Sequence, residues 1–329
     1  MQQTNLKRRE FINLAGIASL AVAVGCTGKQ SSSVINAAES ISPTNAKRVL
    51  RIAHMTDFHI LPQSNIQNKV IQAFRQVQNL TDQPDFILNT GDSVMDSLKS
   101  DKEDVEKQWK AFLDILQSEV KLPIYHAIGN HDVWGWGSNS PAIQKDPLYG
   151  KGMAVQKLKL KSPYYSFDQK GWHFILLDST HLPNNSSKEP YIGQLDDDQF
   201  SWLEKEIEST PAETSICIAS HIPIVSACEM FDGKNEESGN WIIPAAWVHI
   251  DARRFRQLFL KHPNIRVCLS GHTHQHERVD YLGVTYLTNG AICGNWWMGN
   301  YMDFPPAYVL VDLFDDGSVQ SHFIPYQTE

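Results

Sequence analysis

Hydrophobic and polar positions follow one another along the chain in a regular order of short apolar runs and longer amphipathic stretches. Six apolar runs have the length and composition of buried strands, at 49–55, 85–90, 123–129, 172–179, 214–220 and 265–271. Between several of them apolar residues recur at spacings of three and four, which predicts helices over 66–80, 103–118, 197–209 and 251–263. Near-continuous apolar strands separated by amphipathic helices predict an α/β protein with helices on both faces.

The end of the chain follows a different pattern, because three apolar runs succeed one another without a helical stretch between them. These runs cover 284–290, 307–314 and 319–326, and Asp315-Asp316-Gly317 predicts a hairpin turn before the last. Either one sheet gains antiparallel strands here, or a second sheet stacks on the first. We favour two packed mixed β-sheets flanked by helices, with antiparallel strands at the C-terminal end.

The first residues are composed unlike the rest of the chain. A basic opening precedes an apolar run over 11–25, which is too short for a comfortable membrane span and predicts an export signal. Arg8 and Arg9 before this run resemble a twin-arginine signal of bacteria, the alternative being a general secretory signal. We therefore expect the protein to be exported across the cytoplasmic membrane, to the periplasm or the cell surface.

Cys26 follows Ala23-Val24-Gly25 in a pattern that resembles a lipoprotein cleavage box. This predicts a lipid anchor at Cys26 that tethers the protein to the membrane, against simple cleavage nearby or an uncleaved anchor. The chain then divides into an export signal over 1–26, a flexible tether over 27–47 rich in Ser, Asn, Ala and Lys, and a folded domain over 48–329.

Composition narrows the choice of partners. The 329 residues are 42% hydrophobic and 20% charged, which is ordinary for a globular protein of one or two domains, and the net charge is −8. An acidic balance argues against a long nucleic-acid partner, which would need a basic track. Cys217 and Cys268 lie inside strand-like runs and are predicted to be buried thiols, while a bridge between Cys228 and Cys293 stays open.

Unusual polar residues stand where the predicted strands end. Five strand-like runs lead directly into Asp, Asn or His, in the segments Thr56-Asp57-Phe58-His59, Gly91-Asp92, Gly129-Asn130-His131-Asp132, His221 and Gly271-His272-Thr273-His274. In open α/β sheets the ligand site lies beyond the carboxyl ends of the strands. We therefore expect these five segments to meet in one pocket.

The side chains at these ends share a chemistry. Carboxylate, imidazole and amide oxygen suit Mn, Fe or Zn, and the lack of cysteine at the five ends argues against a structural zinc site. These side chains are more than one ion can bind, whereas two ions roughly 3.5–4 Å apart can share them through a bridging carboxylate. Two such ions can also ionise a bound water. Taken singly, Asp57 is equally a strand-end cap, Asn130 a turn residue and His221 a structural histidine. Taken together, they predict phosphoester hydrolysis.

The ordered set of segments resembles the calcineurin-like metallophosphoesterase family, whose five sequence blocks are all present between about Arg51 and His274. The resemblance implies an αββα sandwich and a centre of two divalent or mixed-valence metal ions. It further implies that one ion is held by Asp57, His59 and His274, the other by Asn130, His221 and His272, with Asp92 bridging them. His131 would then face the phosphate and protonate the leaving oxygen or stabilise its charge.

Two positions separate branches of this family. Relatives with a tyrosinate-bound iron carry Tyr three residues after the bridging aspartate, where this chain has Met95. Protein phosphatases carry an arginine after the next acid, and none follows Asp96. Asp96 is spaced as in cyclic-nucleotide phosphodiesterase-like members, where it either hydrogen-bonds His131 or begins the next helix.

Aromatic residues flank the predicted site. Trp134 and Trp136 follow one block and Trp296 and Trp297 follow a late strand, so these four are predicted to form a substrate rim that stacks on a flat group. The resulting hypothesis is a dinuclear hydrolase of a small phosphate ester or diester, with a nucleotide among the candidates. The competing hypotheses are a non-catalytic metal-binding lipoprotein that kept the fold and a nuclease of the same family.

Overall fold

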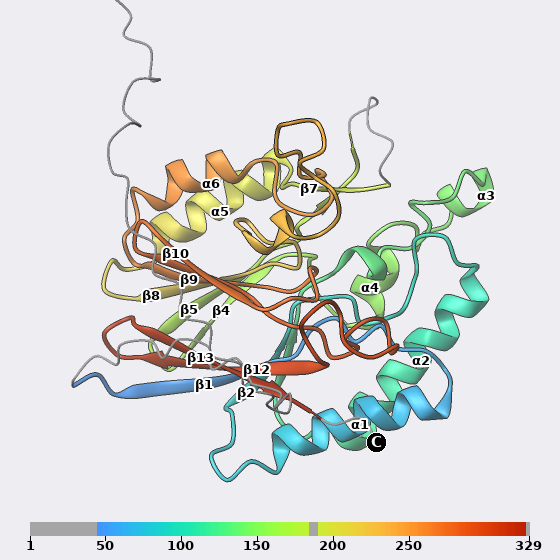
Figure 1. The fold of residues 1–329 in the computed structure, drawn as a ribbon, viewed down its shortest axis with the longest axis horizontal. Helices are drawn as coiled ribbons and strands as arrows, with labels where there is room; N and C mark the ends of the chain where they lie inside the picture. The colour runs from blue at the N-terminus through green and yellow to red at the C-terminus, as the bar shows by residue number, and fades with distance from the viewer. Residues whose placement is uncertain (1–44, 184–189, 327–329) are drawn as a thin grey trace, which may run out of the picture. The chain divides into compact units, whose positions relative to one another are not determined.

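Two mixed sheets lie face to face in the computed structural model, which describes residues 45–183 and 190–326 (Figure 1). The predicted export signal over 1–26, including Cys26, and residues 27–44 of the predicted tether lie outside the described residues. The described residues all belong to a single compact unit. None of the helices in this described part is long and apolar enough to cross a membrane.

The first sheet has five strands in the order β13-β12-β1-β2-β3. They are β1 (Arg48–His54), β2 (Phe86–Asn89), β3 (Ile124–His126), β12 (Ala307–Phe314) and β13 (Val319–Pro325). β1, β2 and β3 run parallel, while β12 pairs antiparallel with both β1 and β13. The carboxyl ends of the three parallel strands therefore open at one edge of the sheet.

The second sheet has six strands in the order β10-β11-β9-β8-β5-β4. They are β4 (Tyr165–Gln169), β5 (Trp172–Leu176), β8 (Ser215–Ala219), β9 (Ile265–Ser270), β10 (Glu277–Tyr281) and β11 (Val284–Thr288). The four central strands run parallel and the two outer ones antiparallel. A separate pair is formed by β6 (Thr180–His181) and β7 (Ile192–Gly193).

Helices cover the outer face of each sheet (Figure 1). The helices are α1 (Ser64–Gln78), α2 (Lys102–Glu119), α3 (Pro141–Gln144), α4 (Gly152–Lys157), α5 (Asp197–Ser209) and α6 (Ala252–Phe259), with short 3₁₀ turns η1 (Asn130–Asp132) and η2 (Cys228–Met230). The helix α5 begins as its acidic start predicts, because the Asp196 side chain accepts a hydrogen bond from the Gln199 N–H at 2.7 Å.

Three apolar layers hold this arrangement together. One lies between α1, α2 and the first sheet, with Phe74 and Phe112 buried. The second lies between the two sheets, where Leu88 and Phe174 belong to one buried cluster. The third lies between the second sheet and the helices α5 and α6, around Phe200. Buried apolar area of this kind supplies most of the stabilisation, and it fixes the strand ends relative to one another.

The prediction of two packed sheets flanked by helices, with antiparallel strands at the C-terminal end, is confirmed. Each predicted strand and long helix is present within a few residues of its expected bounds. The strands β4 and β10 were not predicted. Both lie at sheet edges and have a half-exposed composition, so they lack the continuous apolar run of a buried strand.

Candidate metal centre

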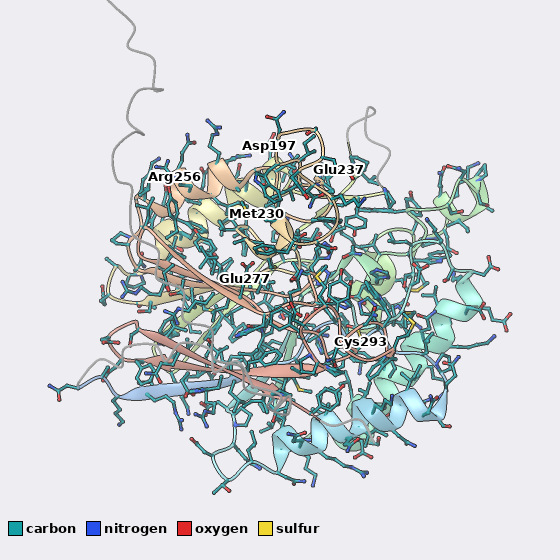
Figure 2. The ribbon with its side chains drawn as sticks, viewed as in Figure 1. Asp197, Met230, Glu237, Arg256, Glu277 and Cys293 are labelled. Atoms are coloured by element: carbon teal, nitrogen blue, oxygen red, sulfur yellow. The ribbon has the colours of Figure 1, made fainter. Side chains whose placement is uncertain are left out.

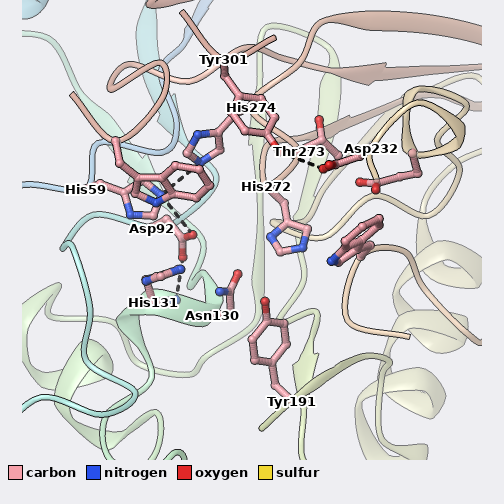
Figure 3. Close-up of a pocket in the computed structure, with 13 residues that line it drawn as sticks. His59, Asp92, Asn130, His131, Tyr191, Asp232, His272, Thr273, His274 and Tyr301 are labelled. Atoms are coloured by element: carbon pink, nitrogen blue, oxygen red, sulfur yellow. Dashed lines mark hydrogen bonds and ion pairs between the residues drawn. The ribbon is translucent and has the colours of Figure 1, made fainter. Parts of the chain in front are cut away.

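The seven predicted metal ligands gather at the carboxyl ends of the parallel strands, and five of them line one cavity, with Asp57 and His221 behind them. Asp57, His59, Asp92 and Asn130 follow strands of the first sheet, whereas His221, His272 and His274 follow strands of the second. The cavity measures about 250 Å³ and lies where the two sheets meet (Figure 3). Its lining comprises His59, Asp92, Asn130, His131, Tyr191, Glu229, Asp232, Trp247, His272, Thr273, His274, Trp296 and Tyr301.

One group of ligand-type atoms forms around Asp57. The Nε2 atoms of His59 and His274 lie 3.1 Å apart, and Asp57 Oδ1 is 3.5 Å from His274 Nε2 and 3.9 Å from His59 Nε2. All three side chains are buried. Two imidazole nitrogens that face each other at this distance, next to a carboxylate, form the kind of donor set that a divalent cation fits.

A second group forms around His221. Its Nε2 atom lies 2.9 Å from Asn130 Oδ1 and 3.2 Å from His272 Nδ1. The amide oxygen and the two imidazole nitrogens come from the ends of β3, β8 and β9, so both sheets contribute. This mixture of oxygen and nitrogen suits the metals predicted from the sequence.

Asp92 lies between the two groups. Its Oδ2 atom is 3.5 Å from His59 Nε2 and 3.2 Å from His221 Nε2, while Oδ1 accepts a hydrogen bond from the His131 backbone N–H at 2.8 Å. The ring of His131 meets that of His59 edge to face, with 4.7 Å between centroids. One carboxylate therefore contacts members of both groups, and it also orients the segment that carries His131.

The backbone selects which nitrogen of two histidines faces the cavity. His274 Nδ1 donates to the Gly294 carbonyl at 2.6 Å, and His272 Nε2 donates to the Ala246 carbonyl at 3.0 Å. Each hydrogen bond fixes a tautomer in which the other nitrogen carries a lone pair. When the rings are neutral, His274 Nε2 and His272 Nδ1 are therefore the acceptors that face the two groups, as a bound cation requires.

Five of the seven residues have left-handed backbone conformations, at Asp57 (φ 55°), His59 (41°), Asp92 (53°), His272 (74°) and His274 (57°). Such values are unfavourable for non-glycine residues and persist where the surrounding structure imposes them. Backbone hydrogen bonds between neighbouring strand ends impose them here, including Asp57 N–H to the Gly91 carbonyl and His59 N–H to the Asp92 carbonyl. The loops are thereby held in a conformation that directs these side chains inward.

Glycine allows the closest approach between the strand ends. A Cβ atom at Gly271 would lie 2.3 Å from Asp57 Oδ2 and from Thr56 Oγ1, and one at Gly129 would lie 2.2 Å from Asp92 Oδ1. Both distances are far inside van der Waals contact. The glycines that precede the ligands in the sequence are therefore required by the packing of one strand end on another.

A chain of hydroxyl groups supports Asp57 from behind. Thr56 Oγ1 donates to Asp57 Oδ2 at 2.8 Å, Thr90 Oγ1 donates to Thr56 Oγ1 at 2.9 Å, and His54 Nε2 lies 2.8 Å from Thr90 Oγ1. All four residues are buried. Such outer contacts fix the direction of a ligand and contribute to metal affinity.

The buried acids and histidines of the two groups influence one another's protonation. Burial would raise the pKa of Asp92, but the charges of His221 and His131 bring that pKa well below its usual value. The pKa of Asp57 is also lowered, since the hydrogen bond from His274 and the charge of His221 outweigh its burial. Burial is the main cause that lowers the pKa of His59 and of His272 to about 3. At neutral pH the acids are therefore ionised and these two imidazoles are neutral. Although burial opposes it, the charge of Asp92 raises the pKa of His221, and Cys293 together with the Asp57 hydrogen bond raises the pKa of His274, so these two imidazoles must release a proton when a cation binds.

Asp132 has a structural part in the site. Its carboxylate accepts hydrogen bonds from the N–H groups of Ser93, at 2.8 Å, and Gly129, at 3.0 Å, and so ties the segment after β2 to the segment after β3. The Asp96 carboxylate accepts a hydrogen bond from the Leu98 N–H at 2.8 Å and forms none with His131. The next helix, α2, begins after Asp101, so neither predicted role of Asp96 is observed.

The predicted aromatic rim is corrected by the structure. Trp134 is buried in the layer beside α1 and α2, with its Nε1–H donating to the Ser100 carbonyl. Trp136 packs against the same layer, and Trp297 does so too while donating to the His59 carbonyl at 2.9 Å. Of the four, only Trp296 lines the cavity, where its ring lies 4.6 Å from that of His274.

Several cavity residues were not predicted. Glu229, Asp232 and Trp247 belong to the segment between β8 and α6, and Tyr191 directly precedes β7. Thr273, from the predicted segment after β9, and Tyr301 also line the cavity. The segment between β8 and α6 has no long helix or strand of its own, and long irregular connections in compact domains are commonly functional. Its length is the one sequence signal that marks it.

The cysteines are all free thiols in the described residues. Cys217 and Cys268 are buried in the second sheet, as predicted. The open question of a bridge between Cys228 and Cys293 is answered by their surroundings, because Cys228 Sγ contacts Glu277 and Cys293 Sγ contacts the Gly294 carbonyl. Neither sulfur is bonded to the other.

Comparison with known proteins adds a family match. A family model described as calcineurin-like phosphoesterase matches residues 50–276. The chain is 25% identical over 290 residues to a 3′,5′-cyclic-nucleotide phosphodiesterase of Nostoc, covering 83% of this chain and 91% of the relative. It is 22% identical over 263 residues to a 3′,5′-cyclic adenosine monophosphate phosphodiesterase of Escherichia coli, covering 76% and 79%.

A comparison of folds agrees with the sequence matches. A dimetal phosphatase from Danio rerio has a TM-score of 0.58 against this chain at 13% identity, and the match covers 85% of this chain and 100% of the other. At this identity the likeness concerns the fold alone. It places the two packed sheets and their helices in a known architecture.

Proposed function

Since the chain belongs to the calcineurin-like phosphoesterase family and is therefore a phosphoester hydrolase, we propose that its cavity hydrolyses a small phosphodiester with two bound metal ions. The observation that carries the proposal is the pair of ligand groups that share Asp92. One group is Asp57, His59 and His274, and the other is Asn130, His221 and His272. When bound, a metal pair supplies Lewis-acid activation of water and of the phosphoryl oxygens.

The protein side chains around this pair would orient the substrate. His131 lines the cavity beside Asp92 and is held there through its backbone N–H. An imidazole at this place can hydrogen-bond a phosphoryl oxygen and give a proton to the leaving oxygen. Because the surrounding ligand groups are buried, bulk water is kept from the reacting atoms on that side.

The charge of the cavity favours a diester over a monoester. Among its described lining residues there is no Lys or Arg, while Glu229 and Asp232 add two carboxyl groups to the cavity. A phosphomonoester carries up to two negative charges near neutral pH, whereas a diester carries one, so the diester is repelled less. The names of the relatives in Nostoc and Escherichia coli, both phosphodiesterases, support the same choice and make a cyclic nucleotide one candidate.

The test combines metal analysis with two aryl esters. Protein purified from medium with added Mn, Fe or Zn is expected to contain about two ions per chain. It should hydrolyse bis(p-nitrophenyl) phosphate at least about tenfold faster than p-nitrophenyl phosphate, measured as kcat/KM. Less than one ion per chain together with no turnover of either ester would instead support a non-catalytic metal-binding protein that kept the fold.

A nuclease of the same family is the other alternative. It predicts activity on a nucleic-acid polymer and a basic track for the backbone phosphates. Digestion of single-stranded and double-stranded DNA by the metal-loaded protein, compared with the aryl diester, distinguishes the two. We expect the aryl diester to be cleaved and the polymers to stay intact.

A further inference from the structure

The wall of the cavity away from the metal centre carries two carboxyl groups. Glu229 lies in η2 and is only 2% exposed, and its Oε2 atom has no hydrogen-bond partner among the described residues. Asp232 follows three residues later, and its Oδ2 atom accepts a hydrogen bond from the Tyr301 hydroxyl at 2.8 Å. Figure 3 shows Asp232 and Asp92 on opposite sides of His272.

No positive charge of the protein balances this wall. In residues 45–183 and 190–326, neither Glu229 nor Asp232 forms an ion pair with Lys or Arg, and the nearby Lys234 pairs outward with Glu237 at 3.2 Å. Burial, together with the charges of Asp232 and Glu277, raises the pKa of Glu229 to about 8. An enclosed acid beside two other acids therefore holds a proton near neutral pH, and it ionises when a cation joins the group.

A third metal ion is a poor candidate for that cation. The groups of His, Cys, Asp and Glu in the described chain that are close enough to hold an ion include neither Glu229 nor Asp232. Aromatic rings border the two acids instead, because Trp247 and Tyr301 line the same cavity. Carboxylates combined with aromatic faces are the usual surroundings of an organic ammonium group.

We propose that Glu229 and Asp232, with Trp247 and Tyr301, bind a positively charged ammonium group, so that the substrate is a phosphodiester of an amino alcohol. This inference rests on the proposed function, because it assigns the phosphate to the metal centre. The two ends of the cavity then have opposite preferences: the cation-binding end beside Asp92 takes the phosphate, and the acidic wall takes the ammonium. Because the ammonium is bound at one end and the phosphate at the other, the substrate can lie in the cavity in only one orientation, which determines which of its two ester groups leaves.

The test uses two diesters that differ only in charge. p-Nitrophenyl phosphorylcholine carries a quaternary ammonium, and 3,3-dimethylbutyl p-nitrophenyl phosphate replaces that nitrogen by carbon with nearly the same shape. The metal-loaded protein is expected to prefer the choline ester by about tenfold in kcat/KM, because the neutral group leaves the acids without a counter-charge. Bis(p-nitrophenyl) phosphate is measured alongside as the check on hydrolysis itself.

Three variants locate the preference. Glu229→Gln and Asp232→Asn are each expected to reduce the choline preference by about three- to tenfold. Glu237→Gln changes an exposed acid of the same segment, labelled in Figure 2, and should keep the preference unchanged. Melting temperatures and metal content of all three variants establish that each is folded and loaded, so a changed ratio reports recognition.

The results distinguish a failure of ammonium binding from a failure of phosphodiester hydrolysis. If bis(p-nitrophenyl) phosphate is hydrolysed but the choline and dimethylbutyl esters react equally fast, the inference is overturned while the proposed function stands. If Glu229→Gln impairs hydrolysis of 3′,5′-cyclic AMP and no choline preference exists, the wall recognises a neutral base and the inference is also overturned. If no diester is hydrolysed by the loaded protein, the proposed function fails and the inference falls with it.

Discussion

His131 differs from its neighbours in the cavity because it is expected to act on substrate while they hold metal. Replacing it by Ala should lower kcat for the aryl diester by about 10²- to 10⁴-fold, the usual contribution of a proton-transferring side chain. Metal content, measured by elemental analysis, should be unchanged. His262→Ala, in a residue outside the cavity, is the matched control and should affect neither quantity.

The structure also shows what would contradict that role. His131 offers a ring nitrogen within 4.8 Å of ligand atoms on His59 and Asp92, a distance that a metal ligand would also have. A variant that loses one ion per chain together with its activity would therefore make His131 a ligand. Turnover equal to that of the native protein would remove it from the reaction.

Glu229 should reduce stability at high pH. Its pKa of about 8 in the folded protein exceeds that of an unfolded glutamate, so its contribution is fully present below about pH 4.5 and is lost as the pH rises through 8. Glu229→Gln should consequently raise the melting temperature by a few degrees at pH 8.5 and by much less at pH 5. Thermal unfolding without ligand at both values measures this, and an equal shift at both would contradict the assignment.

At the scale of a single loop, Gly271 controls the distance between the ends of β9 and β1. A methyl group at this position would meet Asp57 and Thr56 at 2.3 Å, so Gly271→Ala must separate the two strand ends. We expect metal affinity to fall by at least about tenfold to a hundredfold, because the direction of Asp57 is disturbed. Gly283→Ala, at a turn with φ 84° where nothing lies within 4 Å, is a control in which alanine adds backbone strain without a clash, so it should leave metal affinity unchanged.

The strand ends could be predicted from the sequence because each combines two independent signals. A buried parallel strand is a continuous apolar run, and its end is marked where Asp, Asn or His follows, with a glycine before it at Gly91-Asp92 and Gly271-His272. Parallel strands open at one edge, so residues far apart in sequence could be assigned to one pocket. The structure brings those residues together, and whether each holds a metal stays a prediction.

The acidic wall could not be predicted in the same way. Glu229 and Asp232 stand in a segment without periodicity, and Asp232 is held in the cavity by the Tyr301 hydroxyl from a distant part of the chain. Trp134 was misplaced for the converse reason. It lies three residues after His131, but the chain turns at once into the core, where Trp134 pairs with Gly150 in a β-bridge. A short sequence distance from a site residue therefore does not tell whether a side chain points into the site or into the core.

For the whole molecule, the candidate metal ligands come from both sheets. Asp57, Asp92 and Asn130 come from the first sheet, and His221, His272 and His274 come from the second. Ions that bind both sets stabilise the folded state only, because the set does not exist in the unfolded chain. Loading with Mn or Zn should raise the melting temperature by roughly 5–15 °C over chelator-treated protein.

A single substitution separates this effect from general salt stabilisation. Asp92→Ala removes the carboxylate that contacts both groups, so the melting temperature of this variant should respond weakly to added metal. A full response in Asp92→Ala would show that the ions bind elsewhere. Export and the lipid anchor at Cys26, which fall in residues 1–44, stay predictions at this scale.

The left-handed backbone at Asp57, His59, Asp92, His272 and His274 affects how these positions would change during evolution. Glycine and asparagine adopt such angles with less difficulty than histidine does. A descendant released from hydrolysis would gain stability by exchanging these side chains, and mutation would supply the exchange readily. Histidine retained at such angles in a gene copy is therefore a sign that selection still acts on its chemistry.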